Sequence, residues 1–133
     1  KLEDAPFTEC CCVNIGNPHA VFFCNDADVV DLSTIGPILE KNKMFPKGAN
    51  IEFATVKSNH QIRMRVWERG AGITEACGSG ACAVLVASAR NGLTGRKAEV
   101  ILDGGSLDIE WVDDGSILMT GPTSVSFRGE ISV

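Results

Sequence analysis

The sequence has no tyrosine, only two histidines and no excess of positive charge. Its longest apolar stretches are far shorter than the ~20 residues that span a bilayer, so we expect no membrane partner. A net charge of −5 argues against a nucleic-acid partner, which would need a basic face to meet phosphate. No signal-like charged and apolar regions open the chain, but it begins at Lys1 rather than Met, so its ends need not be the natural ones.

The composition otherwise resembles that of an ordinary globular domain. Hydrophobic residues make up 44% and charged residues 22% of the 133 residues, which argues against a disordered or fibrous chain. A chain of this length buries roughly two-thirds of its unfolded surface and needs no disulfide to fold. We therefore expect residues 1–133 to form a single domain, with the polar segment 1–9 as a linker that leads into it.

Cysteine is the unusual component, with thiols at positions 10, 11, 12, 24, 77 and 82. The even number permits a disulfide framework, although such frameworks are typical of small secreted domains that lack a core. No C-x-x-C or C-x-x-H spacing indicates zinc, and Cys77 and Cys82 would not share a helix face. Disulfides and a metal site are therefore less favoured alternatives. We expect reduced thiols, no metal, and a cytoplasmic protein.

Short apolar runs separated by turn residues predict the strands. They lie at 10–15, 20–24, 51–57, 61–69, 98–103, 106–112, 116–120 and 123–131. In the fourth run Ile62, Met64 and Val66 alternate with polar or bulky residues, the period of a half-buried strand. Gly104-Gly105 is a two-residue hairpin signal. Asp31 or Ser33 could cap a helix that runs to about residue 42, with Pro37 tolerated only near its first turn.

A second helix is predicted from the segment 81–87, which is apolar at every position. Asn91-Gly92 supplies its end and Arg90 a favourable charge in the last turn. A helix that is apolar all round has no face for solvent, so it must be enclosed. The expected fold is therefore α+β, a mostly antiparallel sheet wrapped around one central buried helix.

The chemistry is expected just before that helix, in the segment 71–80. Gly78 and Gly80 permit close backbone approach, Ser79 is a plausible N-cap, and Cys77 lies where a helix terminus favours a thiolate. Lowering a thiol pKa from about 8.5 to about 7 needs roughly 2 kcal/mol. A helix terminus supplies ~0.3–1 kcal/mol when exposed and up to ~2 when partly buried. Direct N–H contacts or a basic neighbour would have to help; otherwise Cys77 is only a small residue in a tight turn.

Five blocks of sequence resemble the diaminopimelate epimerase family, in the family's order. Two lie around the candidate thiol, at 66–72 (VWERGAG) and 76–83 (ACGSGACA). The others are 14–19 (NIGNPH) with 50–53 (NIEF), and 119–122 (MTGP). The similarity covers nearly the whole chain but only the C-terminal lobe of a two-lobed family. In that family each lobe is a sheet around a central helix, and the site lies in the cleft between them.

The resemblance implies an isomerase that interconverts LL- and meso-diaminopimelate, independent of pyridoxal phosphate or any other cofactor. Inverting a stereocentre requires proton removal from one face and delivery to the other, hence two acid/base groups. In the family these are two cysteines, one per lobe, and Cys77 matches the one from this lobe. Its partner would belong to a missing N-terminal lobe, so the isolated fragment is expected to be inactive. The resemblance implies a role in lysine biosynthesis and leaves a homodimer open.

The resemblance also implies roles for individual residues. Substrate groups would be bound by Asn17, Asn50, Glu68 and Arg69, and the α-carboxylate by the amides of Gly78 and Ser79. His19 and Glu68 would tune the thiols. Ser79 stands where many relatives have threonine, and either residue keeps the hydroxyl. Taken singly, Asn17 is an ordinary turn residue, His19 an ordinary structural histidine, and Glu68 with Arg69 an ordinary solvated pair.

Two other functions fit parts of this pattern. Another racemase of the same fold, such as a proline racemase relative, is disfavoured because the block 67–70 (WERG) suits a substrate with a second amino acid head group. A non-catalytic module could instead bind an anion at the Gly-rich segment 78–80. Selective alkylation of Cys77 distinguishes a catalytic thiol from such a module.

Overall fold

A computed structural model of the chain describes residue 7 and residues 9–132. Most of the expected linker at 1–9 lies outside the described residues. Phe7 is an exception, because its ring packs edge-on against Phe22 and Phe53, at centroid distances of 6.1 and 4.7 Å. This residue is therefore part of the folded domain.

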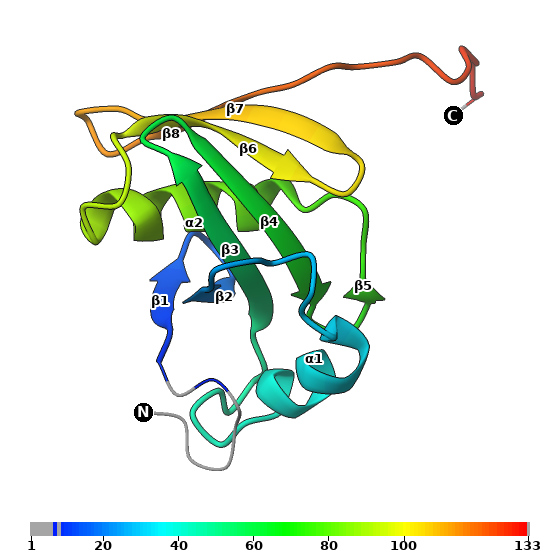
Figure 1. Cartoon of the computed structure of the whole chain (residues 1–133). Helices are drawn as coiled ribbons and strands as arrows, with labels where there is room; N and C mark the ends of the chain where they lie inside the picture. The colour runs from blue at the N-terminus through cyan, green and yellow to red at the C-terminus, as the bar shows by residue number, and fades with distance from the viewer. Residues whose placement is uncertain (1–6, 8, 133) are drawn as a thin grey trace.

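The described residues form one mixed sheet, curled into a half-barrel (Figure 1). Its strands are β1 (Cys11–Asn14), β2 (Pro18–Phe23), β3 (Asn50–Ser58), β4 (Gln61–Glu68), β5 (Gly72–Ile73), β6 (Lys97–Leu102), β7 (Gly105–Trp111) and β8 (Ile117–Thr120). Their order is β1-β2-β3-β4-β6-β7-β8, with β5 paired to β4. The pairs β2·β3 and β4·β6 are parallel and the other pairs antiparallel. The predicted α+β class is confirmed.

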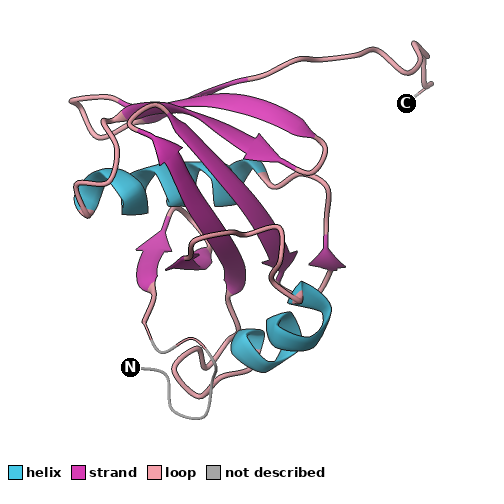
Figure 2. Ribbon diagram, in the orientation of Figure 1, coloured by secondary structure: helices cyan, strands magenta, loops and turns pink. Residues whose placement is uncertain are grey.

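Two helices accompany the sheet, α1 (Leu32–Glu40) and α2 (Gly78–Arg90) (Figure 2). Helix α2 lies along one face of the sheet and contacts every strand except β5. Its residues 80, 81 and 83–88 are buried, whereas Ser79, Cys82 and Ala89 stay partly exposed. The sheet thus covers most of α2, but enclosure on all sides is not seen in the described part of the chain. No helix there is long and apolar enough to cross a membrane.

Strand β4 shows how the two faces of the sheet are filled. Ile62, Met64 and Val66 are buried against α2, as their alternation predicts. Trp67 points to the opposite face and packs with a second apolar cluster that includes Leu32 and Leu39 of α1. Helix α1 therefore covers the other face near the end of β4.

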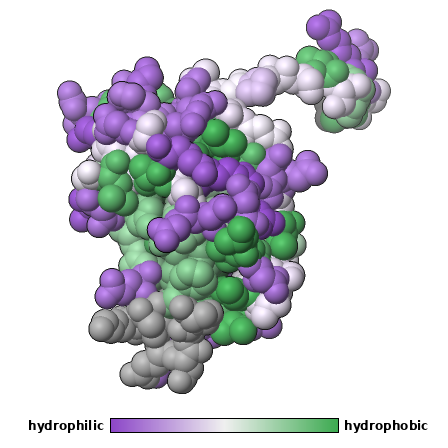
Figure 3. Space-filling view, in the orientation of Figure 1, coloured by the Kyte–Doolittle hydropathy of each residue, from purple (hydrophilic) through white to green (hydrophobic). Residues whose placement is uncertain are grey.

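The C-terminal segment 121–132 carries no strand, so the strand predicted at 123–131 is wrong. Its apolar residues Val125, Phe127 and Ile131 are 74%, 85% and 88% exposed. The tail runs away from the domain with hydrophobic residues on its surface (Figures 1 and 3). The alternation is that of a strand, but no sheet edge among the described residues pairs with it.

Three local predictions also need correction. Leu102 pairs with Gly105, so the turn between β6 and β7 is Asp103-Gly104 rather than Gly104-Gly105. Pro37 lies inside α1, beyond its first turn. It is tolerated there because the missing N–H releases only the carbonyl of Ser33, an exposed residue that water can reach. The two-residue strand β5 was not predicted, since it exists only by pairing with β4.

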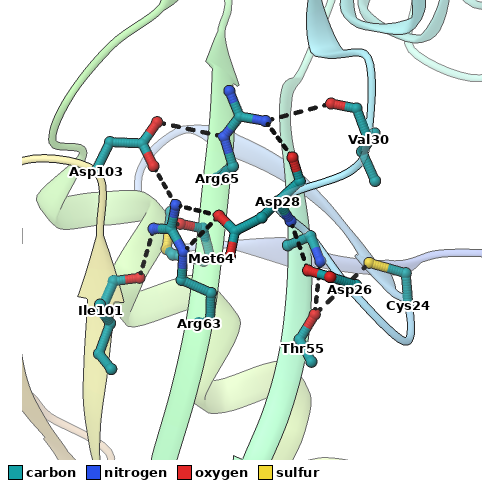
Figure 4. Close-up of polar contacts among 11 residues, drawn as sticks. Cys24, Asp26, Asp28, Val30, Thr55, Arg63, Met64, Arg65, Ile101 and Asp103 are labelled. Atoms are coloured by element: carbon teal, nitrogen blue, oxygen red, sulfur yellow. Dashed lines mark hydrogen bonds and ion pairs between the residues drawn. The ribbon is translucent and has the colours of Figure 1, made fainter.

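Two arginines of β4 hold the loop between β2 and α1 against the outer face of the sheet (Figure 4). Arg63 donates to Asp28 at 2.6 and 3.0 Å and also binds Asp103. Arg65 donates to Asp103 and to the carbonyl of Val30, both at 3.3 Å. The hydrogen bond from Arg63 holds the pKa of Asp28 below its ordinary value. This network ties three separate segments together on the face away from α2.

Candidate active site

The topology brings the candidate residues to one edge of the sheet. Strands β2 and β3 are parallel and begin at this edge, and β4, antiparallel to β3, ends there. Because side chains alternate along a strand, His19 shares the α2 side of the sheet with Val21, and Glu52 shares it with Ala54. The N-terminus of α2 lies at the same edge, because Ser79 contacts Asn17 and Gly80 lies beside Glu52.

Cys77 is itself the N-cap of α2, with extended backbone angles φ −141° and ψ 100°. Its sulfur accepts a hydrogen bond from the backbone N–H of Gly80 at 3.3 Å. The expectation that Ser79 caps the helix is therefore wrong, because Ser79 already lies in the first turn. Cys77 is only 7% exposed, so this N-cap residue is buried.

Burial raises the pKa of the Cys77 thiol. The hydrogen bonds from Ser79 and Gly80 act in the opposite direction, and the nearby carboxylate of Glu68 adds to the increase. The direct N–H contact that a thiolate would need is thus present, but desolvation outweighs it. The raised pKa favours the protonated form of Cys77.

Asn17, His19 and Ser79 are linked to the thiol by side-chain hydrogen bonds. The amide oxygen of Asn17 lies 2.9 Å from His19 Nε2, and its amide nitrogen donates to Ser79 Oγ at 3.3 Å. Ser79 Oγ lies 3.6 Å from Cys77 Sγ. Three of the predicted site residues therefore form one connected group with Cys77.

Glu52 belongs to the same group and was missed in the sequence analysis. It is fully buried, and its Oε1 lies 2.6 Å from His19 Nδ1. Burial raises the pKa of its carboxyl group, and its Oε2 has no hydrogen-bond partner among the described residues. The signal that could have found it is a glutamate inside the apolar run of β3, where a charged residue is rarely buried without a role.

The side-chain amide of Asn50 is hydrogen-bonded to two backbone groups of the protein. Its nitrogen donates to the carbonyl of Pro18 at 3.0 Å, and its oxygen accepts from the backbone N–H of Arg69 at 2.9 Å. The exposed Arg69 side chain donates to the carbonyl of Lys47 at 3.2 Å. Asn50 thus joins the start of β2 to the segment that follows β4, and positions the backbone of both.

Glu68, at the end of β4, accepts a hydrogen bond from the hydroxyl of Thr74 at 2.5 Å. Its negative charge contributes to the raised pKa of both Cys77 and Glu52. Thr74 was not predicted as part of the site, because a lone threonine in a turn carries no signal in the sequence.

The first turn of α2 offers donors to an anion. The N–H groups of Gly78 and Ser79 have no acceptor among the described residues. A side chain at Gly78 would meet the sulfur of Met119 at 3.0 Å, so β8 closes one side of this turn. Unpaired N–H groups at a helix N-terminus bind carboxylates and phosphates.

The other thiols show no comparable surroundings. All six cysteines are free, and Cys12 is exposed. Cys82 lies on α2, where burial raises its pKa, and Cys24 lies beyond the end of β2. The described residues contain no group of three or more His, Cys, Asp or Glu side chains that could hold a metal ion.

Comparisons with known proteins identify the family to which the sequence is similar. The family model described as diaminopimelate epimerase matches residues 11–126. A curated diaminopimelate epimerase from Rhodospirillum centenum is 62% identical over 96% of this chain and 44% of its own length. One from Erythrobacter litoralis is 53% identical over 88% of this chain and 44% of its own length. The chain therefore spans less than half the length of these relatives.

Solved structures show the same fold at low identity. A phenazine biosynthesis protein of the PhzF family from Bacillus anthracis aligns with a TM-score of 0.55 and 24% identity. That alignment covers 85% of this chain and 36% of the other. A PhzF family protein from Enterococcus faecalis aligns with a TM-score of 0.55 and 15% identity, over 82% of this chain and 38% of the other. The likeness extends to the fold alone.

Proposed function

Since the chain belongs to the diaminopimelate epimerase family, we propose that it is the C-terminal lobe of an enzyme that interconverts LL- and meso-diaminopimelate. Cys77 would supply one of two thiols that exchange the α-proton. The observation that carries this proposal is the buried Cys77 thiol at the N-cap of α2, beside the unpaired N–H groups of Gly78 and Ser79. An α-carboxylate bound by those N–H groups would hold the α-carbon next to the sulfur.

The proposed reaction needs two acid/base groups on opposite faces of the α-carbon. A thiolate on one face takes the α-proton, and a thiol on the other face delivers its own proton to the carbanion. The second sulfur becomes a thiolate, so charge and protons balance. Because the reaction runs in both directions, Cys77 would act as the acid for one stereoisomer and as the base for the other. No pyridoxal phosphate or other cofactor takes part.

The remaining predicted residues would bind the rest of the substrate. Arg69 carries an exposed guanidinium suited to the distal carboxylate, and Glu68 a carboxylate suited to the distal ammonium group. Asn17 and Asn50 each keep one amide N–H beyond their hydrogen bonds within the protein, and would present it to the substrate. His19 would tune the thiol through Asn17.

The second thiol would come from a further lobe of the whole protein. The curated relatives are more than twice as long as this chain, which matches 44% of their length. The exposed apolar residues Val125, Phe127 and Ile131 support a partner surface, and we assign that surface to the second lobe. Association into homodimers remains open. A cytoplasmic location in lysine biosynthesis belongs to the same proposal, since reactive thiols need a reducing compartment.

The test is Cys77→Ser in the full-length protein, with α-proton exchange in D₂O measured separately from each stereoisomer. We expect exchange from one stereoisomer to fall far more than from the other, because each sulfur serves one face. Cys12→Ser, at an exposed thiol, is the control and should leave both rates unchanged. Equal loss from both stereoisomers would contradict the assignment. The isolated chain should show no epimerisation, and any turnover by it would overturn the division between lobes.

A non-catalytic anion-binding module is the second candidate, favoured by the raised pKa of Cys77. Such a module would bind a carboxylate at α2 without using the sulfur. Epimerisation by the full-length protein separates the two. Catalysis requires the wild type to exchange the α-proton and Cys77→Ser to lose that exchange at one face, whereas the binding module requires carboxylate binding without exchange.

A further inference from the structure

Glu52 lies close to the Cys77 thiol, on the other side of Gly80. A Cβ atom built on Gly80 would lie 3.1 Å from Glu52 Oε1 and 3.2 Å from Cys77 Sγ. The carboxyl group and the sulfur therefore face each other across the bare glycine of α2. Glu52 is fully buried, and so is its partner His19, 33 residues away in the chain.

The surroundings of Glu52 favour its neutral form. Its Oε2 has no partner among the described residues, and a buried carboxylate with an unpaired oxygen is strongly disfavoured. The ionisable groups that face it are His19 from β2, Glu68 from β4 and Cys77 from α2. The negative charge of Glu68 adds to the effect of burial, and both raise the pKa of Glu52. Burial, the unpaired Oε2 and the nearby charge of Glu68 all favour a protonated Glu52.

A neutral Glu52 sets the direction of every hydrogen bond that follows. Its hydroxyl donates to His19 Nδ1 at 2.6 Å, so the imidazole proton is on Nε2. That N–H donates to the Asn17 oxygen at 2.9 Å, and the Asn17 amide then donates to Ser79 Oγ at 3.3 Å. The Ser79 hydroxyl is left to donate to Cys77 Sγ, at 3.6 Å.

The other tautomer of His19 would reverse the chain. With the proton on Nδ1, the bare Nε2 would accept from the Asn17 amide nitrogen, and the Asn17 oxygen would face Ser79. The Ser79 hydroxyl would then donate to Asn17 rather than to the sulfur. The Cys77 thiolate would lose one of its two donors, and its pKa would rise further.

We propose that Glu52 is a positioning residue of this site: as a neutral acid it holds His19 in the Nε2–H form and so directs the Ser79 hydroxyl at the Cys77 sulfur. The benefit to catalysis rests on the proposed function of Cys77. The direction of the hydrogen bonds is independent of that function, and it can be measured in a protein that has no enzymatic activity.

The first experiment reads the tautomer of His19 by NMR in this chain, labelled with ¹⁵N-histidine. The chain has only two histidines, and the exposed His60 serves as the internal reference. We expect neutral His19 with the proton on Nε2 at pH 7, both in the wild type and in Glu52→Gln, whose amide N–H replaces the acid hydroxyl. An imidazolium in the wild type, or a changed tautomer in Glu52→Gln, overturns the proposal.

The second experiment follows the alkylation of Cys77 against pH by peptide mass spectrometry. Glu52→Gln should match the wild type, whereas Glu52→Leu should shift the half-maximal pH upward by about half to one unit, as expected for one weakened hydrogen bond. If Glu52 acted only as a nearby negative charge, both variants would shift the half-maximum downward, which contradicts the proposal. Glu75→Gln, which removes an exposed carboxylate near Cys77, is the matched control and should cause no upward shift.

Each result bears on one idea only. Glu52→Gln tests the proposal even if Glu52→Leu does not fold, since any change in its tautomer or alkylation profile refutes the neutral acid. Failure of the Cys77→Ser exchange experiment would remove the proposed function but leave the hydrogen-bond direction measurable. Conversely, the Cys77→Ser experiment could support the epimerase while Glu52→Gln changes the alkylation of Cys77. That combination would keep the proposed function and refute the role of Glu52.

Discussion

Replacing Gly36 by alanine tests the contact that holds α1 against the end of β4. A Cβ atom at position 36 would lie 2.5 Å from two atoms of the Trp67 ring and 2.7 Å from a third. The ring cannot simply move away, because Trp67 Nε1 donates to Glu40 Oε2 at 2.7 Å. Glu40 is also tied to the backbone N–H of Gly70 at 3.1 Å, so the displacement would reach the segment around Glu68.

Three effects decide the size of the change. Overpacking costs about 1–3 kcal/mol, and loss of a hydrogen bond to a charged acceptor costs roughly 1.5–3 kcal/mol. Alanine regains roughly 1 kcal/mol through its better helix propensity. The net expectation is a destabilisation of about 1.5–5 kcal/mol. For a domain of this size that corresponds to a fall in melting temperature on the order of 10 °C.

Urea unfolding followed by circular dichroism measures this change. The matched control places Gly36→Ala in a Trp67→Leu background, where the smaller side chain leaves room for the methyl group. There the alanine should be neutral or stabilising by up to about 1 kcal/mol. A single Gly36→Ala variant as stable as the wild type would refute the argument, because it would mean that Trp67 does not pack tightly on α1.

Two further predictions concern surfaces away from the site. Arg63 lowers the pKa of Asp28 from its ordinary value of 3.8. The ion pair therefore stabilises the folded state at pH values above 3.8, and this stabilisation is lost as the pH falls through the pKa of Asp28 in the folded state. Arg63→Met should therefore unfold at lower urea concentration than the wild type at pH 7, with a difference that shrinks at pH 2.5; a constant difference would argue against the ion pair. Phe127→Ser and Ile131→Ser should leave the stability of this chain within ~0.5 kcal/mol, because these side chains are 85% and 88% exposed, but should lower activity in the full-length protein. A loss of stability in the isolated chain would show instead that the tail packs on this lobe.

Local patterns in the sequence predicted the helices and most strands to within a few residues. The alternation of Ile62, Met64 and Val66 is confirmed by their burial in β4. Asn91 caps α2 and Gly92 follows with a φ of +68°, as the Asn-Gly pair indicated. These features depend on neighbours within a few positions, so the sequence itself is sufficient to indicate them.

Predictions that depend on distant partners were less successful. The alternating segment 123–131 has the period of a strand but no neighbouring edge with which to pair. Strand β5 forms only because β4 passes beside it. Ser79 has the chemistry of an N-cap, yet α2 begins at Gly78, so that position belongs to Cys77.

The sequence by itself determined the family, the α+β class and the position of the candidate thiol before a glycine-rich helix start, because these are properties of contiguous motifs. Only the tertiary structure decided the electrostatic state of the site. The parallel pairing of β2 with β3 brings Glu52 to His19 across 33 residues, and burial by α2 raises the pKa of both Glu52 and Cys77. Desolvation and hydrogen-bond direction depend on what surrounds a group in space, and no local pattern of residues records that.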